Sequence, residues 1–179
     1  MDLASRKILF FSLSTMLLMV VIVYYSFYSG REIAQRYTPL VDSTIEIKLE
    51  LTTAHLWFEE VISGEPIVSI EDVWAHIDKS EWYANAMLNG GAKEDIKLAP
   101  LSHPHLRHKI EETLKAIYYF RQIAQRRWAL KSTSAINTAI DQQFDLAFLQ
   151  FKIAADNVEI ALHQAIAQDM QEFTLTQQL

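Results

Sequence analysis

Uncharged residues run without interruption from Ile8 to Ser29, in the segment ILFFSLSTMLLMVVIVYYSFYS. Because a helix rises about 1.5 Å per residue, this segment reaches about 33 Å, which is enough to cross the hydrocarbon core of a bilayer. A cleaved signal peptide has an apolar core of only about 7 to 15 residues, followed by a small-residue cleavage site. This segment is longer and continues into SGREIAQRY. We therefore predict an uncleaved transmembrane helix over residues 8–29.

The orientation of this helix follows from its basic flank. Arg6 and Lys7 directly precede the apolar segment. Basic residues on a short N-terminal flank stay on the cytoplasmic side of the membrane. We expect residues 1–7 to be cytoplasmic and residues 30–179 to form a domain on the opposite side.

Beyond the membrane segment, apolar residues recur at alternating steps of four and three positions, as on one face of a helix. This pattern predicts one helix of about 33 residues that continues the membrane helix and ends at Gly64 and Pro66. Its predicted inward positions are Ile33, Tyr37, Leu40, Thr44, Ile47, Leu51, Ala54, Phe58 and Val61.

A second helix is predicted from Ser69, which can cap it together with Asp72, to the sequence LNGG. Residues 89–102 contain Gly90, Gly91 and Pro100 and are predicted to form a loop over the end of the helices. The inward positions of this second helix are expected to be Val73, Ile77, Ser80, Ala84 and Met87.

Two further apolar repeats complete the pattern. Pro104 is tolerated in the first turn of a helix and begins a third repeat, which reaches about Trp128. The fourth repeat runs from about Ala135 into the C-terminal tail. The third helix is expected to turn inward Leu106, Ile110, Leu114, Ile117, Phe120 and Ala124. The fourth is expected to turn inward Ile140, Phe144, Phe148, Phe151, Ala155, Val158, Leu162 and Met170.

The shortage of turn residues sets the fold class. The chain has four glycines and four prolines in 179 residues, which favours a few long helices over many strands. Short connections make neighbouring helices antiparallel, so we predict an all-α protein in which the transmembrane helix precedes an up-down-up-down antiparallel four-helix bundle. No second apolar run of spanning length follows. We therefore expect that these residues are either part of a longer receptor or a module that is anchored by a single membrane span.

Charge and composition exclude several function classes. A net charge of −6 without a long Lys/Arg run offers no basic face to a nucleic acid, and no cysteine is present to bind metal as thiolate. Glu59 and Glu60 diverge by about 100° on a helix, are expected to point outward and cannot flank one bond. Arg121, Arg126 and Arg127 are expected to pair with acidic side chains, with an anionic ligand as the alternative. We predict no catalytic residues, no cofactor and no enzyme activity.

Large aromatic rings lie beside or outside the inward positions of the first two predicted helices, among histidine and carboxylate side chains. Three interpretations stay open: the rings complete the core, they line a small-molecule pocket, or they form a dimer face. The candidate ligand-binding residues are His55, Trp57, Glu59, Trp74, His76, Glu81, Trp82 and Tyr83.

The histidine spacing gives only an incomplete metal site. His55 and Glu59 are four positions apart and share a helical face, and His76 could join them from the next helix. A site needs three or four convergent ligands, and no HExxH pattern is present. We therefore predict no metal centre. A solvated cap, or a weak adventitious nickel or zinc site, is expected at His103, His105 and His108.

Four blocks of the sequence, taken in order, resemble a known family. They are AHLWFEEVISGE, DVWAHIDKSEWYANAMLNGG, a helix ending in FRQIAQRRW, and FDLAFLQFKIAADNVE. Over about residues 30–179 they resemble the extracytoplasmic helical sensor region of bacterial transmembrane signalling proteins, which include two-component histidine kinases and diguanylate cyclases. The resemblance implies a homodimer in the bacterial inner membrane, with a periplasmic bundle and a cytoplasmic output domain. This chain departs from such receptors in lacking the second membrane helix and the output domain.

The sequence thus predicts an extracytoplasmic sensor module that is held in the lipid bilayer by residues 8–29. A small-molecule ligand with different affinities for two states of the bundle would displace its first helix relative to its last. The alternative is a non-sensing scaffold or dimerisation module anchored in the periplasm by one membrane span.

Overall fold

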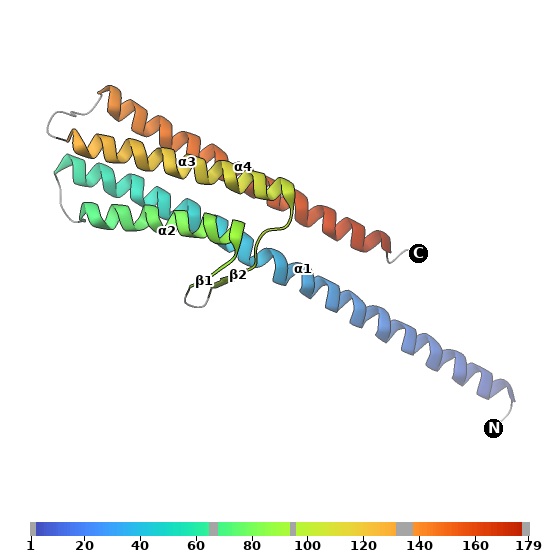
Figure 1. The fold of residues 1–179 in the computed structure, drawn as a ribbon. Helices are drawn as coiled ribbons and strands as arrows, with labels where there is room; N and C mark the ends of the chain where they lie inside the picture. Colours follow the sequence, from blue (N-terminus) through green and yellow to red (C-terminus); the bar gives the residue numbers. More distant parts are fainter. Residues whose placement is uncertain (1–2, 65–67, 94–95, 132–137, 177–179) are drawn as a thin grey trace.

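A computed structural model describes residues 3–64, 68–93, 96–131 and 138–176. The described residues are almost entirely helical, which confirms the predicted all-α class, and one short β-hairpin joins the second and third helices (Figure 1). The elements are α1 (Leu3–Ser63), α2 (Ile70–Asn89), β1 (Gly91–Lys93), β2 (Ile96–Leu98), α3 (Pro104–Ala129) and α4 (Ala139–Thr176).

α1 is a single helix that joins the apolar N-terminal segment to the rest of the fold, as predicted. It continues through Pro39, although an internal proline removes one helical hydrogen bond. Gly64 follows its last residue with a φ of 83°, a conformation that glycine adopts without a steric penalty. Pro66, the second predicted stop, lies outside the described residues.

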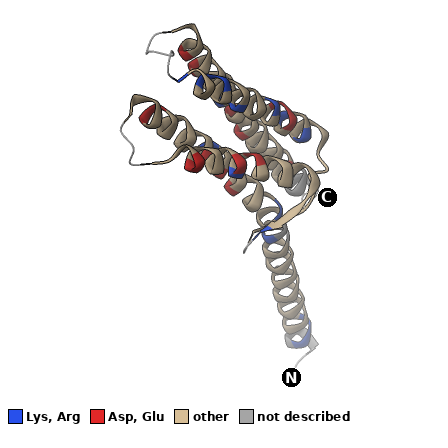
Figure 2. Cartoon of the chain, turned by 60° about the vertical axis from the view of Figure 1, so that its left-hand side comes forward, with Lys and Arg blue, Asp and Glu red and all other residues tan. Residues whose placement is uncertain are grey.

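The N-terminal part of α1 is long and apolar enough to cross a membrane. Its apolar side chains are uncovered in the described chain; Phe10 and Phe11, for example, are each 77% exposed. Figure 2 shows this stretch as an uncharged helix beyond the basic residues near the N-terminus. Exposure on this scale in water would be costly, so the segment fits a lipid environment.

The predicted caps of the shorter helices are present. Ser69 and Asp72 form a reciprocal capping box at the start of α2, in which the Ser69 hydroxyl accepts from the Asp72 backbone N–H at 3.2 Å. At the start of α3, Nδ1 of His103 accepts from the backbone N–H of Leu106 at 3.4 Å. The expected cap is therefore confirmed at His103. α4 begins at Ala139, and the earlier start near Ala135 lies outside the described residues.

The connection between α2 and α3 differs from the predicted loop. β1 and β2 pair antiparallel, with Gly91 opposite Leu98 and Lys93 opposite Ile96. Leu98 is buried, so the hairpin packs onto the helices. Strands of three residues are too short to show an alternating pattern, and for this reason the sequence indicated only a loop.

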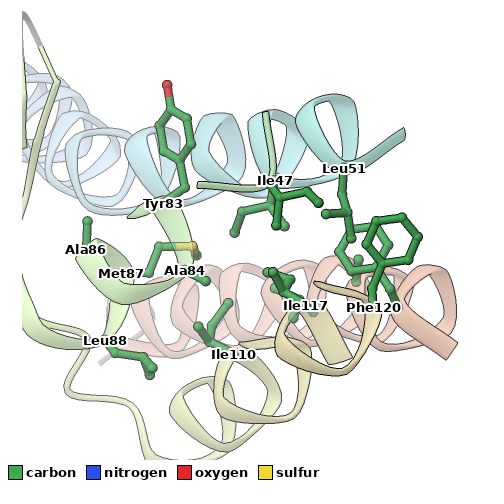
Figure 3. Packing of buried hydrophobic residues seen from close by; sticks show 14 of the residues in the cluster. Ile47, Leu51, Tyr83, Ala84, Ala86, Met87, Leu88, Ile110, Ile117 and Phe120 are labelled. Atoms are coloured by element: carbon green, nitrogen blue, oxygen red, sulfur yellow. The ribbon is translucent and has the colours of Figure 1, made fainter. Parts of the chain in front are cut away.

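The helices pack side by side around one hydrophobic core. α1 contacts α2 and α4, and α3 contacts the same two helices. Figure 3 shows Ile47 and Leu51 of α1 meeting Met87 of α2 and Ile117 and Phe120 of α3. Burial of this kind contributes about 25 cal/mol for each Å² of apolar surface removed from water.

Most of the predicted inward positions are buried. Two polar ones, Thr44 and Ser80, satisfy their hydroxyl groups by donating to the backbone carbonyls of Leu40 (2.8 Å) and Ile47 (3.2 Å). The prediction is wrong for Met170, which is 56% exposed: it lies on α4 beyond Ala165, the last residue of this helix that belongs to the buried core.

α1 and α4 stay in contact up to the end of the fold from which the apolar N-terminal segment extends. Both the apolar part of α1 and the C-terminal end of α4 extend past the same end of the packed helices (Figure 1). Asp169 of α4 accepts from Nη1 of Arg36 at 3.3 Å and from the Tyr37 hydroxyl at 3.0 Å. Further along α1 from the apolar N-terminal segment, Nζ of Lys48 donates to two carboxylates of α4, those of Asp156 at 2.7 Å and Glu159 at 3.0 Å.

An apolar row that the sequence analysis did not identify runs along the outer faces of these two helices. Its members recur at helical spacing and are each half-exposed or more. We call this row the outer stripe; its residues are Ile45, Leu49, Leu56, Leu146, Leu149, Ile153 and Ile160.

Candidate functional site

The eight predicted ligand-binding residues do not gather around one cavity. Glu81 lies on α2 and pairs with Arg121 of α3, with an Oε2–Nη2 distance of 3.0 Å. Trp74 packs on the Phe58 ring of α1, with centroids 6.2 Å apart. The other six form three separate groups, described next.

Trp82 and Tyr83 form one group, close to the hairpin. Their rings meet edge to face with centroids 5.1 Å apart, and the Lys93 ammonium lies 5.6 Å from the Trp82 ring. Tyr83 is 4% exposed and belongs to the core, as the first of the three interpretations expects. A cavity of about 510 Å³ adjoins Tyr83, but the rest of its lining comes from α1 and β2 rather than from the other candidate residues.

Trp57 and His76 form a second group, around a buried carboxylate. Their rings meet edge to face with centroids 4.5 Å apart. Nδ1 of His76 contacts the carboxylate of Glu50, whose side chain is only 5% exposed, and Nζ of Lys79 donates to the same carboxylate at 2.5 Å. Burial alone would raise the pKa of Glu50, but the hydrogen bonds from Lys79 and His76 outweigh burial and lower it.

Glu50→Gln is expected to lower the free energy of unfolding by about 1–2 kcal/mol at pH 7, because the charged hydrogen bonds to Lys79 and His76 are lost. The folded-state pKa of Glu50 lies below its ordinary value of 4.5, so its stabilisation is present above pH 4.5 and is lost as the pH falls through the folded-state pKa. The difference in the free energy of unfolding between variant and wild type should therefore be smaller at acidic pH. Denaturant titrations of both proteins at pH 7 and about pH 3.5 measure it.

The exposed residue Glu60 supplies the control for that experiment. Glu60→Gln removes the same charge from an exposed position of the same helix. It should change stability by less than about 0.5 kcal/mol at either pH. An E50Q deficit that stayed constant between the two pH values would contradict the assignment of the effect to the Glu50 carboxylate.

His55 and Glu59 form the third group, at the end of the fold far from the apolar N-terminal segment. The His55 ring stacks on Phe148 and Phe144 of α4, with centroid distances of 4.1 and 5.0 Å. Its Nε2 atom is buried and makes no hydrogen bond with any described residue, although Oδ1 of Asp145 lies 3.5 Å away.

Arg127 of α3 lies beside this group with its side chain completely buried. Its guanidinium contacts both carboxylate oxygens of Glu59, and Nη2 lies 2.5 Å from Oδ1 of Asp141. The guanidinium carbon is 4.9 Å from the centroid of Phe144, within cation–π range. We define the distal cluster as His55, Glu59, Arg127, Asp141 and Asp145.

The distal cluster corrects one prediction and confirms another. Glu59 does not simply point outward, because the buried guanidinium of Arg127 draws its carboxylate toward α3. Two of the three arginines expected to pair with acidic side chains do so: Arg127 with Glu59 and Asp141, and Arg121 with Asp78 and Glu81. Arg126 is exposed and forms no ion pair with the described residues.

Burial of the imidazole ring changes the pKa of His55. It lowers the pKa of His55 below its ordinary value by more than the carboxylates of Glu59 and Asp145 raise it. Three carboxylates in the distal cluster, those of Glu59, Asp141 and Asp145, lie near one guanidinium, that of Arg127. The cluster therefore has an excess of negative charge next to a buried ring nitrogen that lacks a hydrogen bond within the described chain.

Comparisons with family models, curated proteins and solved structures find no match to this chain.

Proposed function

We propose that the chain is the extracytoplasmic sensor module of a bacterial inner-membrane signalling receptor. In this proposal residues 1–7 are cytoplasmic, and the helices beyond residue 30 form an up-down-up-down four-helix bundle in the periplasm. The basic residues Arg6 and Lys7 before the apolar segment support the orientation. The packing of α1 and α3 against both α2 and α4 supports the bundle.

The observation that carries the proposal is the course of α1. One helix runs from the apolar segment, past Arg36 and Lys48, to the distal cluster. α4 lies along it and contacts it at both ends: Asp145 faces His55 at the far end, and Asp169 bonds Arg36 and Tyr37 near the membrane. A ligand that alters the α1–α4 contact far from the membrane thus has a rigid helix through which to displace the membrane segment.

A sensor and a scaffold differ in whether this contact changes. The chain has no native cysteine, so Gln35→Cys and Gln168→Cys place a spin label on each helix near the membrane. Electron-spin distance measurements on the full chain in lipid nanodiscs would compare buffer alone with Zn²⁺, Mn²⁺, small amines and organic acids. A shift with one of these solutes supports the sensor, because a signal must favour one of two states. An unchanged distance in every condition supports the scaffold.

A second label pair tests whether any shift reflects helix movement. Gln35→Cys and Asp42→Cys place both labels on α1, within a stretch that is continuous helix. Their separation should stay constant in every condition. A change in this pair would mean that α1 itself deforms, which contradicts displacement of a rigid helix.

The outer stripe favours a homodimer as the assembled state. Two copies anchored in one bilayer are parallel, and a two-fold axis along the membrane normal would bring their α1 and α4 faces together. Half-exposed residues such as Leu49 (55%) and Ile153 (55%) would then be covered by the same face of the second copy. The apolar groove between the two helices, of about 440 Å³, lies along the same face.

Leu49→Asp combined with Ile153→Asp is expected to weaken self-association of the full chain at least about tenfold, because four carboxylates would meet at the centre of the interface. Sedimentation in detergent micelles measures it. Tyr118→Asp, on the exposed face of α3, is the matched control and should leave association unchanged. Equal association of wild type and both variants would rule out the outer stripe as the dimer face.

A further inference from the structure

Three potential metal ligands meet between α1 and α4 in the distal cluster. One ring nitrogen of His55, one oxygen of Glu59 and one oxygen of Asp145 all lie within 4.8 Å of one another. His55 and Glu59 are four positions apart on α1 and therefore share a face, while Asp145 comes from the facing side of α4. The sequence had paired the first two with His76, which instead contacts Glu50.

The distance between His55 and Asp145 suits a small divalent ion. Bonds of about 2.0–2.2 Å place two ligand atoms of a tetrahedral site about 3.3–3.6 Å apart. The observed 3.5 Å between Nε2 of His55 and Oδ1 of Asp145 already lies in this range. Asp145 is 66% exposed, so its side chain can adjust toward Glu59, and the site stays open to solvent for metal entry and a water ligand.

The charge of the cluster also suits a divalent ion. Asp141 and Arg127 form one neutral pair. Glu59 and Asp145 then supply two carboxylates beside the imidazole ring, and a doubly charged cation would balance their charge. The Nε2 atom of His55 is a buried polar atom that lacks a hydrogen bond to any described residue, and a metal bond would satisfy it.

The surroundings fix the first two ligands in place. Stacking on Phe144 and Phe148 orients the His55 ring. Two nitrogens of the Arg127 guanidinium hold Glu59, whose carboxylate still has lone pairs for a metal. Such support of metal ligands by neighbouring groups typically changes affinity about 10- to 100-fold.

From these observations we propose that His55, Glu59 and Asp145 bind a divalent first-row transition-metal ion, with Zn²⁺ the best match to one nitrogen and two oxygen ligands. The ion would clamp α1 to α4 at the end far from the membrane. The role of the ion as the sensed signal rests on the proposed function, whereas binding of the ion to these three residues does not.

The test uses the full chain in detergent micelles after removal of metal with a chelator, titrated with Zn²⁺ in a calorimeter. We expect one saturable site and at least about tenfold weaker binding by Asp145→Asn, whose exposed side chain is not part of the core. Co²⁺ should give the visible absorption of a four- or five-coordinate site, and this absorption should be lost in His55→Gln. Melting curves confirm that each variant is folded.

Two controls separate this site from other ligands. Glu60→Gln removes an adjacent exposed charge that is not a ligand, and a double variant His105→Gln, His108→Gln removes histidines near the start of α3. Both should bind Zn²⁺ like wild type. The site is overturned if Asp145→Asn binds as tightly as wild type, if the double variant loses the binding, or if no saturable binding occurs.

The spin-label pair at positions 35 and 168 then tests the metal's role separately. Zn²⁺ binding with a changed distance supports both the site and its sensing role. Zn²⁺ binding with an unchanged distance keeps the site and overturns its role as the signal. If Zn²⁺ does not bind, the metal site is wrong, while a response of the same labels to another solute would still support the sensor.

Discussion

Arg127→Ala is expected to lower the free energy of unfolding of the full chain by about 3–5 kcal/mol, the usual cost of removing one partner from a buried ion pair. The side chain is completely buried, and its loss leaves Glu59 and Asp141 without their shared cation. Asp141 is only 14% exposed, so water can replace the guanidinium only in part. Denaturant unfolding followed by tryptophan fluorescence measures the loss.

Arg126→Ala provides the matched control, because the neighbouring arginine is exposed. It should cost less than about 0.5 kcal/mol. Arg127→Lys should recover only part of the loss, since an ammonium group cannot bond two carboxylates through a planar fork. A loss below about 1 kcal/mol for Arg127→Ala would mean that Glu59 and Asp141 rehydrate easily and that the distal cluster is not closed to water.

Replacing Arg127 together with its two carboxylate partners separates two contributions to stability. One is the net contribution of the ion pairs, and the other is the cost of leaving a buried charge without a partner. A variant with Arg127→Met, Glu59→Leu and Asp141→Leu removes the guanidinium together with both of its carboxylate partners. Apolar replacement of a complete buried ion pair is often neutral or stabilising. We expect this variant to be more stable than Arg127→Ala, and to have lost Zn²⁺ binding because Glu59 is one of the proposed ligands.

The position of Arg127 could have been predicted from the sequence. The inward residues of the third helix recur in steps of three and four, through Ile117, Phe120 and Ala124. One further step of three reaches Arg127. The pattern of apolar residues stops at Ala124 because the next inward residue is charged, so the buried ion pair was invisible to a search for apolar residues alone.

The helices themselves were predictable because their signals are local. The apolar spacing and the cap at Ser69 depend only on residues within a few turns of one another. The distal cluster depends instead on which residues of different helices meet. Asp145 lies opposite His55 because of the relative axial position of α1 and α4, and no spacing within one helix determines that position.

The same reasoning explains where the aromatic residues lie. Tyr83 and Trp82 are consecutive, yet Tyr83 is buried in the core while Trp82 is half-buried beside the hairpin. The hairpin was not predicted, so the partners of Trp82 were not predicted either. A helix with a wide apolar face and a helix that lines a ligand pocket show the same pattern of apolar residues in the sequence. Only the packing of neighbouring elements distinguishes the two.

Phe144→Ala is expected to lower the free energy of unfolding by about 3–5 kcal/mol, more than any other apolar substitution near the distal cluster. Phe144 is fully buried, and its ring centroid lies 4.7 Å from that of Phe58 and 4.9 Å from that of Phe120. It also stacks on His55 and lies within cation–π range of the Arg127 guanidinium. Its removal therefore takes contacts from side chains of both α1 and α3 at one point. Denaturant unfolding of the full chain measures the loss.

Leu149→Ala, on the same helix, distinguishes loss of packing from loss of helix propensity. Leu149 is 50% exposed in the outer stripe, and alanine suits a helix at least as well as leucine does. This control should lower the free energy of unfolding by less than about 1 kcal/mol when the chain is monomeric. If Phe144→Ala cost no more than Leu149→Ala, the rings around His55 would not form a rigid core. The proposed metal ligand would then lack the fixed orientation on which the site depends, so the two measurements also test the geometry of the distal cluster.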